Sequence, residues 1–295
     1  MQELNSPSPS TRLAFTIREL KTVEEFRTAE VVQRNIWAMP DRLEVVPLHL
    51  LLTAQKNGGL VLGAFDAAGT MVGFLFGFPG RTAGGRWKQC SHMAGVLPDY
   101  RRSGLGEALK RYQREFVLRQ GLDLITWTFD PLEGVNATLN FAKLGAVCRT
   151  YERDLYGSMA DRLNQGLPSD RFEVEWWIAG PRVASRMQQG PARLRLADME
   201  RAGAQRVNQT EVEGGLRYPL APDLDGRASL LLVEIPADFQ AIKALSREIA
   251  AAWREHTRTI FEAYFQAGHW ATEFFSDHSE GERRNFYVLQ RDARP

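Results

Sequence analysis

The stretch of sequence that decides the fold is Val96–Gly106, which reads VLPDYRRSGLG. It leaves an apolar segment, makes a turn and opens a segment with helical periodicity. The first amides of a helix have no partners within the helix, and the helix dipole gives them partial positive charge. Gly104 and Gly106 let an anion approach this backbone, and Arg101 and Arg102 add full positive charge. The pattern therefore predicts an anion-binding site at the start of a helix.

The helix that follows the turn has a clear apolar face. Its apolar residues recur at the spacing of one helical face and end before Gly121. The other face carries Lys110, Arg111 and Arg114, which we expect to form a solvated surface.

Strand and helix patterns surround this helix in an order that defines the fold class. An apolar strand at 122–129 follows the helix, so the strand–helix–strand crossover predicts a parallel pair. The whole order predicts a mixed α+β fold built on a mixed sheet. Strand patterns cover 14–18, 60–65, 71–78, 87–96, 122–129 and 146–155, and helix patterns cover 22–39, 47–57, 105–120 and 136–144.

The chain after a polar turn at 166–170 forms a second block. Strand patterns at 172–178, 229–235, 272–275 and 285–289 accompany a strong amphipathic helix at 247–266. We therefore predict a disordered leader at 1–12, a first domain at 13–168 and a smaller α/β lobe at 169–295. The lobe is interpreted either as a lid or as a degenerate second copy of the first domain.

Composition excludes several classes of function. The 37 Lys and Arg residues balance 36 Asp and Glu residues, so the net charge of +1 gives no general attraction to nucleic acid or to an anionic membrane. Two cysteines provide neither a disulfide framework nor a metal cluster. No apolar run is long enough to span a bilayer, and the N-terminus has no signal-peptide pattern, so we expect a cytoplasmic location without bound metal.

Two motifs in this order resemble a known family. The segment Ala14–Leu155 resembles the GNAT superfamily of acyl-CoA-dependent N-acyltransferases. That family has an Arg/Gln-x-x-Gly-x-Gly/Ala turn, which reads RRSGLG at Arg101–Gly106. It also has a Tyr-x-Lys-Leu-Gly-Phe helix end, which reads FAKLGA at Phe141–Ala146. The segments at 92–98 and 127–131 complete the pattern of a GNAT branch with an extended C-terminal part.

The resemblance implies a coenzyme A site and an activity. In such proteins the strand before the turn diverges from its neighbour, the pantetheine arm pairs with the freed backbone, and the turn binds the pyrophosphate. The co-substrate would be acetyl-CoA or a longer acyl-CoA such as succinyl-CoA, and the acceptor a small amine or amino acid. The implied cofactor-binding residues are Gly95, Val96, Arg101, Arg102, Ser103, Gly104, Leu105, Gly106, Asn136 and Phe141.

Amine acylation also requires acid–base groups. A primary amine with a pKa of about 10 must lose a proton before it attacks, so a general base is needed. His92 is the preferred base, because side-chain alternation would place it on the same strand face as Val96. Asp130, at the end of the following strand, is the second candidate. Phe141 replaces the family tyrosine that protonates the leaving thiolate, so Tyr151 or Tyr156 becomes the alternative acid.

Other functions stay open at this stage. The loss of the family tyrosine also fits a non-catalytic acyl-CoA-binding sensor. A structural protein with an interaction surface in its C-terminal block is a third interpretation. Some GNAT proteins pair through added strands, so the resemblance also allows a homodimer. Trp37 and Arg42 lie in the linker that would border the acceptor, where Arg42 could pair with an acceptor carboxylate.

Overall fold

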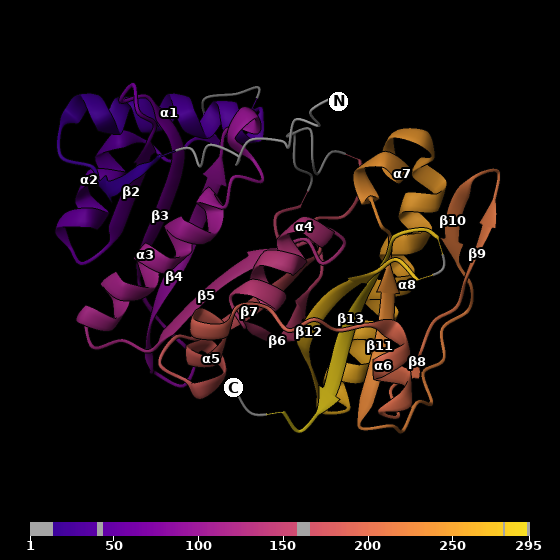
Figure 1. Cartoon of the computed structure of the whole chain (residues 1–295). Coiled ribbons are helices and arrows are strands. Elements are labelled where there is room, and N and C mark those ends of the chain that lie inside the picture. The colour runs from indigo at the N-terminus through magenta and orange to yellow at the C-terminus, as the bar shows by residue number, and fades with distance from the viewer. Residues whose placement is uncertain (1–13, 40–43, 158–165, 280, 294–295) are drawn as a thin grey trace, which may run out of the picture.

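The computed structural model describes residues 14–39, 44–157, 166–279 and 281–293. The predicted leader at 1–12 and Arg42 lie outside these residues. Eleven strands form one mixed sheet, flanked by helices on both faces (Figure 1). The predicted α+β class with a mixed sheet is confirmed.

The first elements follow the predicted order. Thr22 begins the first helix with a reciprocal capping box, in which its side chain accepts from the amide of Glu25 and the Glu25 carboxylate accepts from the Thr22 amide. These elements are β1 (Thr16–Glu19), α1 (Val23–Trp37), α2 (Leu48–Lys56), β2 (Leu60–Phe65), β3 (Met71–Arg81) and β4 (Trp87–Val96).

The crossover that contains the predicted anion site comes next. Its helix and the following strand have the predicted positions, and the short helix after them is partly π-helical. The elements are η2 (Pro98–Tyr100), α3 (Leu105–Arg119), β5 (Leu124–Phe129), α4 (Gly134–Ala137), the π-helical segment η3 (Thr138–Lys143) and β6 (Val147–Glu152). β4 and β5 are parallel, as the crossover predicted.

The remaining elements contain the predicted strands and the long helix. They are β7 (Arg171–Trp177), α5 (Pro181–Gln189), α6 (Leu196–Arg201), β8 (Gln205–Arg206), β9 (Thr210–Glu213), β10 (Leu216–Pro219), β11 (Leu230–Ile235), α7 (Phe239–Leu245), α8 (Arg247–Gln266), β12 (His269–Asp277) and β13 (Arg284–Arg291).

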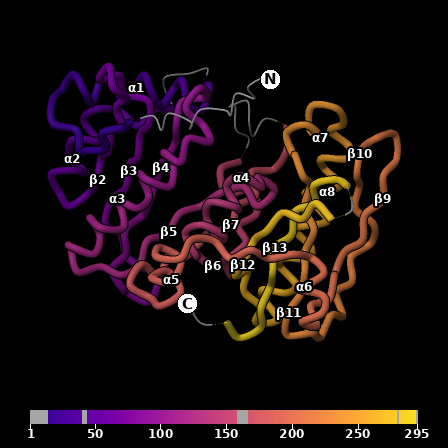
Figure 2. Tube along the Cα trace, in the orientation of Figure 1, coloured from indigo at the N-terminus to yellow at the C-terminus, as the bar shows by residue number. Residues whose placement is uncertain are grey.

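The sheet does not divide where the sequence suggested. Its order is β1-β2-β3-β4-β5-β7-β6-β12-β13-β11-β8. β7 inserts between β5 and β6, so a boundary after residue 168 would separate hydrogen-bonded neighbours. The C-terminal strands extend the same sheet through the pairing of β6 with β12, which lie next to each other in Figure 2. The second block is therefore a continuation of the sheet, and we call residues 178–293 the C-terminal half.

The strand order is symmetrical about the pairing of β6 with β12. The order β4-β5-β7-β6 is followed by β12-β13-β11-β8. Read outward from the central pair, β12 corresponds to β6, β13 to β7, β11 to β5 and β8 to β4. Each half has a bulge at the same place, after Cys148 in β6 and after Ala271 in β12, and these two residues pair with each other. The two runs of strands therefore match in order and in bulge position about this pair. This topology supports the interpretation of a degenerate second copy over that of a lid.

Helices α3, η3, α5 and α8 pack on one face of the sheet. Side chains from all four helices join a single apolar cluster, in which the ring centroids of Phe172 and Tyr287 lie 5.5 Å apart. α1 and α2 cover the opposite face of β2–β4.

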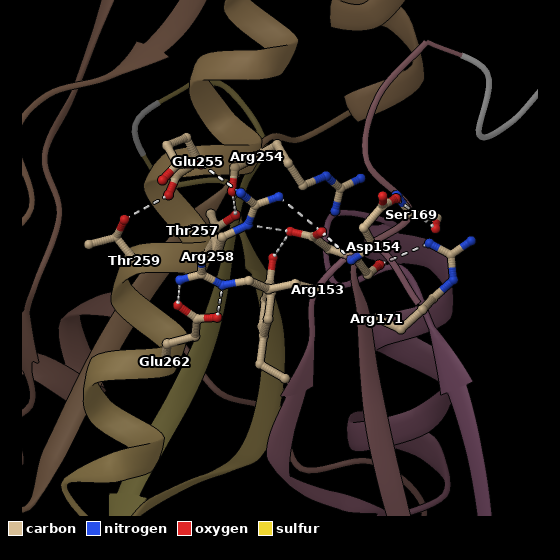
Figure 3. A network of polar contacts seen from close by, with 12 residues as sticks. Arg153, Asp154, Ser169, Arg171, Arg254, Glu255, Thr257, Arg258, Thr259 and Glu262 are labelled. Atoms are coloured by element: carbon tan, nitrogen blue, oxygen red, sulfur yellow. Dashed lines mark hydrogen bonds and ion pairs between the residues drawn. The ribbon is translucent and has the colours of Figure 1, made fainter. Parts of the chain in front are cut away.

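Two arginines on α8 fasten the C-terminal half to the first. Arg254 and Arg258 lie four residues apart, so they project from one face of the helix (Figure 3). Arg254 forms a bidentate pair with Asp130, which follows β5, and Arg258 forms one with Asp170, which precedes β7. Both carboxylates are buried. The two halves are therefore joined by paired charges as well as by apolar contacts.

Candidate active site

β4 and β5 are hydrogen-bonded to each other at one end only. Their last pair among the described residues is Cys90 with Thr126. β4 continues to Val96 while pairing with β3 on its other side, so it diverges from β5 from Ser91 onward (Figure 1). The edge of β4 that faces β5 is therefore not used by the sheet beyond this point, and an extended ligand can hydrogen-bond to it. The divergence implied by the family resemblance is confirmed.

The turn between β4 and α3 gathers several unpaired amides. Arg102 (φ 65°) and Gly104 (φ 87°) both have left-handed backbone conformations. The amides of 105–107 lie in the first helical turn and have no carbonyl acceptor within the described chain. Only the amide of Leu105 makes a contact, at 3.4 Å from Ser103 Oγ. Successive amides in this conformation are typical of anion-binding turns, and the binding of an anion here stays a prediction.

Charged side chains around the turn have different roles. Arg101 donates to the backbone carbonyl of Ile36, near the end of α1, at 3.1 Å. It therefore stabilises the end of that helix as well as adding positive charge to the turn. Arg102 is exposed and makes no polar contact within the described residues. Glu107, in the first turn of α3, pairs with Arg111 at 2.9 Å and with Lys143 at 3.4 Å. These pairs offset the negative charge nearest the amides.

Gly95 and Val96 lie on the free edge of β4, where the resemblance placed them. A Cβ atom on Gly95 would lie 2.5 Å from Ile36 Cγ2 and 3.1 Å from the Trp37 ring, so the packing of α1 requires a glycine. Val96 points to the other face, where it packs in the cluster with Leu105. Their backbones are positioned for a ligand, and contact with its arm remains a prediction.

The helical segment opposite the turn supports one predicted contact and not another. Leu139 of η3 has a methyl group 4.0 Å from the position of a Cβ on Gly106, so η3 borders the turn. Asn136 is exposed in α4, the short helix that precedes η3. Phe141 is fully buried and packs edge-on against Tyr287 at 5.5 Å. The geometry therefore does not support a cofactor contact for Phe141, which instead packs the core between the halves.

His92 occupies a β-bulge that the sequence did not predict. In the pairing of β4 with β3, Phe76 pairs with Met93 and Gly77 pairs with Ser91. His92 lies between these two pairs without a partner on β3, so it is the extra residue of the bulge. The bulge breaks side-chain alternation. His92 contacts Phe76 in the cluster under α1, whereas Val96 belongs to the cluster under α3. The prediction that His92 and Val96 share a face is therefore wrong.

The surroundings of His92 suit a neutral base. Its ring lies 5.8 Å from that of Phe76 and 6.0 Å from that of Phe78, measured between centroids, while the residue keeps an exposed surface. Burial of part of the ring lowers the pKa of His92 below its usual 6.5. The imidazole is therefore mainly neutral at pH 7 and able to accept a proton.

Asp130 has a different environment from the one predicted for a proton relay. Its two oxygens accept hydrogen bonds from Arg254 at 2.8 and 2.5 Å, and one also accepts from the Leu132 amide at 2.9 Å. Arg171 lies 3.9 Å away. This buried carboxyl group, bound by Arg254 from α8, joins the two halves. The geometry supports a structural role for Asp130 and not a catalytic one.

The two candidate tyrosines differ in exposure. The Tyr151 hydroxyl donates to Asp170 at 2.7 Å, and burial raises the pKa of Tyr151 far above its usual value of 10. It cannot release a proton near neutral pH. Tyr156 is exposed, and its hydroxyl lies 2.8 Å from Thr128 Oγ1 on β5.

Lys110 is the functional candidate that the sequence interpretation missed. We expected it on the solvated face of α3, but only 3% of the residue is exposed, so this expectation is wrong. Lys110, Gln113 and Val117 are spaced i, i+3 and i+7, and all three are buried. This spacing indicates that Lys110 faces the core with Gln113 and Val117, whereas the charge of a lysine suggests a solvated position.

The C-terminal half has no second diverging gap at the matching position. β8 and β11 are parallel, like β4 and β5. Beyond their last pair, the Asn208 side chain donates to the carbonyl of Glu234 at 2.9 Å and accepts from its amide at 2.8 Å. These two bonds occupy the backbone amide and carbonyl of Glu234, which a neighbouring strand would otherwise pair with. The matching position in the C-terminal half therefore lacks the free backbone edge that β4 has.

The described residues contain no group of three or more His, Cys, Asp or Glu side chains arranged to hold a metal ion. Among the described helices, none combines the length and apolar composition needed to cross a bilayer. A cavity of about 620 Å³ lies away from the turn, between η3 and the end of β12, and is lined by Thr138, Arg193, Arg195 and His278 among others.

Comparisons with known proteins gave matches among solved structures alone. No family model and no curated protein matches the chain. The chain is similar to the ribosomal-protein-S18-alanine N-acetyltransferase of Escherichia coli, with 19% identity and a TM-score of 0.44 over 57% of this chain and 97% of that one. It is similar to a GNAT-family acetyltransferase of Streptococcus pneumoniae, with 17% identity and a TM-score of 0.42 over 55% and 98% of the two chains. A third similar structure is a GNAT-family N-acetyltransferase of Escherichia coli in complex with CoA, with 18% identity and a TM-score of 0.37 over 47% and 73%.

Proposed function

We propose that this protein is an N-acyltransferase of the GNAT type. It transfers an acetyl group, or a longer acyl group such as succinyl, from coenzyme A to a primary amine of a small molecule or amino acid. The amine attacks the thioester directly while both substrates are bound. The C-terminal half is a degenerate second copy that supports the first without a cofactor site of its own.

One observation carries this proposal: the unpaired amides at 105–107 stand at the end of the free edge of β4 that begins at Ser91. A ligand that has an anionic diphosphate at one end and an extended amide-containing arm fits this combination. The amides and Arg102 would bind the diphosphate, and the edge from Ser91 to Val96 would pair with the arm. The thioester at the end of the arm would then lie near the point of divergence, beside His92.

His92 is the proposed general base. Freeing a primary amine of pKa about 10 at pH 7 costs about 4 kcal/mol, which a neutral imidazole and a partly apolar surface can reduce. Phe76 and Phe78 supply that apolar surface beside His92. The tetrahedral oxyanion would be stabilised by a backbone amide on the free edge of β4.

We expect His92→Gln to lower kcat by about 10²- to 10⁴-fold with little change in CoA affinity, because the variant loses a general base. In the intact protein, kcat should rise with pH through a pKa below 6.5, since only neutral His92 accepts a proton. Steady-state rates from pH 5 to 8 measure both effects. An unchanged rate and pH profile in the variant would remove His92 from the mechanism.

The proposal is tested by mass spectrometry of the purified protein mixed with acetyl-CoA or succinyl-CoA and a pool of amines and amino acids. We expect an acylated product and an equal amount of free CoA.

The absence of Tyr at position 141 favours a second candidate, an acyl-CoA-binding sensor. CoA binding without any product across the pool would support the sensor. Addition of peptides to the pool tests whether the acceptor is larger. A cytoplasmic location and a homodimer remain predictions.

A further inference from the structure

Lys110 bridges the two strands where they diverge. Cys90 and Thr126 form the last pair of β4 with β5, so Ser91 and Trp127 are the first residues beyond it. Lys110 Nζ donates to Ser91 Oγ at 2.8 Å and lies 3.7 Å from the centroid of the Trp127 ring. A single amine on α3 thus contacts both strands at the apex of the gap.

No carboxylate neutralises this amine. From β4 it faces Ser91, from β5 it faces Trp127, and from its own helix it faces Gln113, whose Oε1 accepts at 3.3 Å. None of these three groups titrates near neutral pH. Lys110 forms no ion pair within the described residues, and burial alone lowers its pKa to about 7.

Nearby charged side chains on α3 are directed elsewhere. Glu107 pairs with Arg111 and Lys143, and Arg114 donates to the carbonyl of Ile178 at 2.9 Å. A lysine buried among polar but uncharged partners costs folding free energy. Leucine would fill the same space without that cost. The position of Lys110 beside the gap therefore indicates that its charge has a function.

We propose that Lys110 is the general acid that protonates the thiolate of coenzyme A as it leaves. This inference rests on the proposed function, because it requires an acyl-CoA in the gap between β4 and β5. It gives Lys110 the role for which the sequence interpretation considered Tyr151 and Tyr156.

The acceptor nitrogen forms a bond with the thioester carbon and gives its proton to His92. The carbon–sulfur bond then breaks, and its electron pair goes to sulfur, which takes a proton from the Lys110 ammonium. His92 releases its proton to water, and neutral Lys110 regains one from water. The products are an amide and free CoA thiol.

Base and acid approach the gap from opposite faces of the sheet in this arrangement. His92 lies with Phe76 on the face covered by α1, whereas Lys110 lies under α3 on the other face. The amine is deprotonated on one side, and the leaving sulfur is protonated on the other. Separation of the two groups prevents them from neutralising each other.

The first test needs no turnover. The thiolate of bound CoA absorbs in the ultraviolet, so its ionisation can be titrated in complexes of CoA with the intact protein and with Lys110→Met. We expect the thiol of bound CoA to ionise at least tenfold more readily with the intact protein, because the Lys110 ammonium stabilises the thiolate. Lys56→Met, which removes an exposed lysine at the end of α2, should leave the titration unchanged. Equal thiol pKa values in the two complexes would overturn the proposal.

The second test uses leaving groups of different acidity. Lys110→Met should lower kcat by about 10²-fold with acetyl-CoA, with little effect on KM, since a general acid acts in the transition state. It should have far less effect on an acetyl thioester of an acidic aromatic thiol, which leaves without a proton. Lys110→Arg should stay defective with acetyl-CoA, because a guanidinium does not give up its proton. An equal loss with both thioesters would indicate a structural role and refute the acid.

The pH profile separates the two proposals further. In the intact protein, kcat should fall as pH rises above about 7, because only protonated Lys110 can donate. This alkaline limb should be absent in Lys110→Met and present in His92→Gln. If CoA binds and its thiol titration depends on Lys110 but no amine is acylated, the transferase proposal and the acid role both fail, and only the contact between Lys110 and the thiol stands. If CoA does not bind, both fail.

Discussion

Gly106→Glu should abolish CoA binding while leaving the fold intact or more stable. Glycine is the least favourable ordinary residue inside a helix, by about 1 kcal/mol relative to alanine. An acidic side chain in the first turn also interacts favourably with the helix dipole, by about 0.3–1 kcal/mol. A Cβ at this position meets only Leu139 within 4 Å, at 4.0 Å, so the backbone has room for a side chain here. The melting temperature should therefore stay level or rise.

The same carboxylate should repel a bound diphosphate. Two like charges about 5 Å apart near a protein surface interact by about 3 kcal/mol, which corresponds to at least a 100-fold loss of affinity. Calorimetric titration of the variant with CoA measures this loss. Gly106→Gln has nearly the same shape without the charge, so it separates repulsion from bulk and should bind more tightly than the Glu variant.

Backbone strain is controlled by a matched pair of glycines. Gly104 and Gly203 both have φ of 87° and open space where a Cβ would lie. Gly104→Ala and Gly203→Ala should therefore destabilise the protein equally, and the first alone should weaken CoA binding. A Gly106→Glu variant that binds CoA like the unmodified protein would place the diphosphate elsewhere.

Arg254→Met should destabilise the protein by about 3–5 kcal/mol, because it leaves the buried Asp130 carboxylate without its bidentate partner. Such a loss is a large part of the 5–15 kcal/mol that stabilises a typical domain. Chemical denaturation followed by tryptophan fluorescence measures it. The double variant Asp130→Leu/Arg254→Met should recover much of the loss, since the carboxylate that Arg254 neutralised is removed together with it.

An ion pair at the surface between the same helix and the residue after β6 provides the control. Arg153 and Glu262 form an ion pair in which the arginine is largely exposed (Figure 3). Glu262→Gln should change stability by less than about 1 kcal/mol. An Arg254→Met variant as stable as this control would show that the two halves do not depend on the buried charges.

The second buried pair adds a dependence on acid. Burial alone would raise the pKa of Asp170, but hydrogen bonds from Arg258 and Tyr151 lower it below its usual 3.8. A carboxylate with a lowered pKa stabilises the fold above its unfolded-state pKa and loses that contribution as pH falls. Stability should therefore decline below about pH 4.

The local parts of the fold could be predicted from the sequence because their signals are local. The capping box at Thr22 and Glu25 fixes the start of α1, and the apolar stripe of α8 gives its bounds at 247–266. The insertion of β7 between β5 and β6 depends on contacts between distant segments, which no local pattern encodes. That insertion is why a boundary after residue 168 divides a continuous sheet.

The sequence predicts the backbone geometry of the candidate site better than the positions of its side chains. The turn at 101–106 and the divergence of β4 follow from a motif that specifies backbone geometry. His92 was placed on the wrong face because one extra residue in β4 reverses alternation. Asp130 and Lys110 take their roles from partners more than ten residues away, Arg254 and Trp127 respectively.

A crystal structure of the full chain with CoA tests the central claim most directly. We predict that the diphosphate oxygens accept hydrogen bonds from the amides of 105–107, and that the pantetheine arm lies along β4 between Ser91 and Val96. CoA bound instead in the cavity between η3 and the end of β12, with the turn at 101–106 empty, would contradict it.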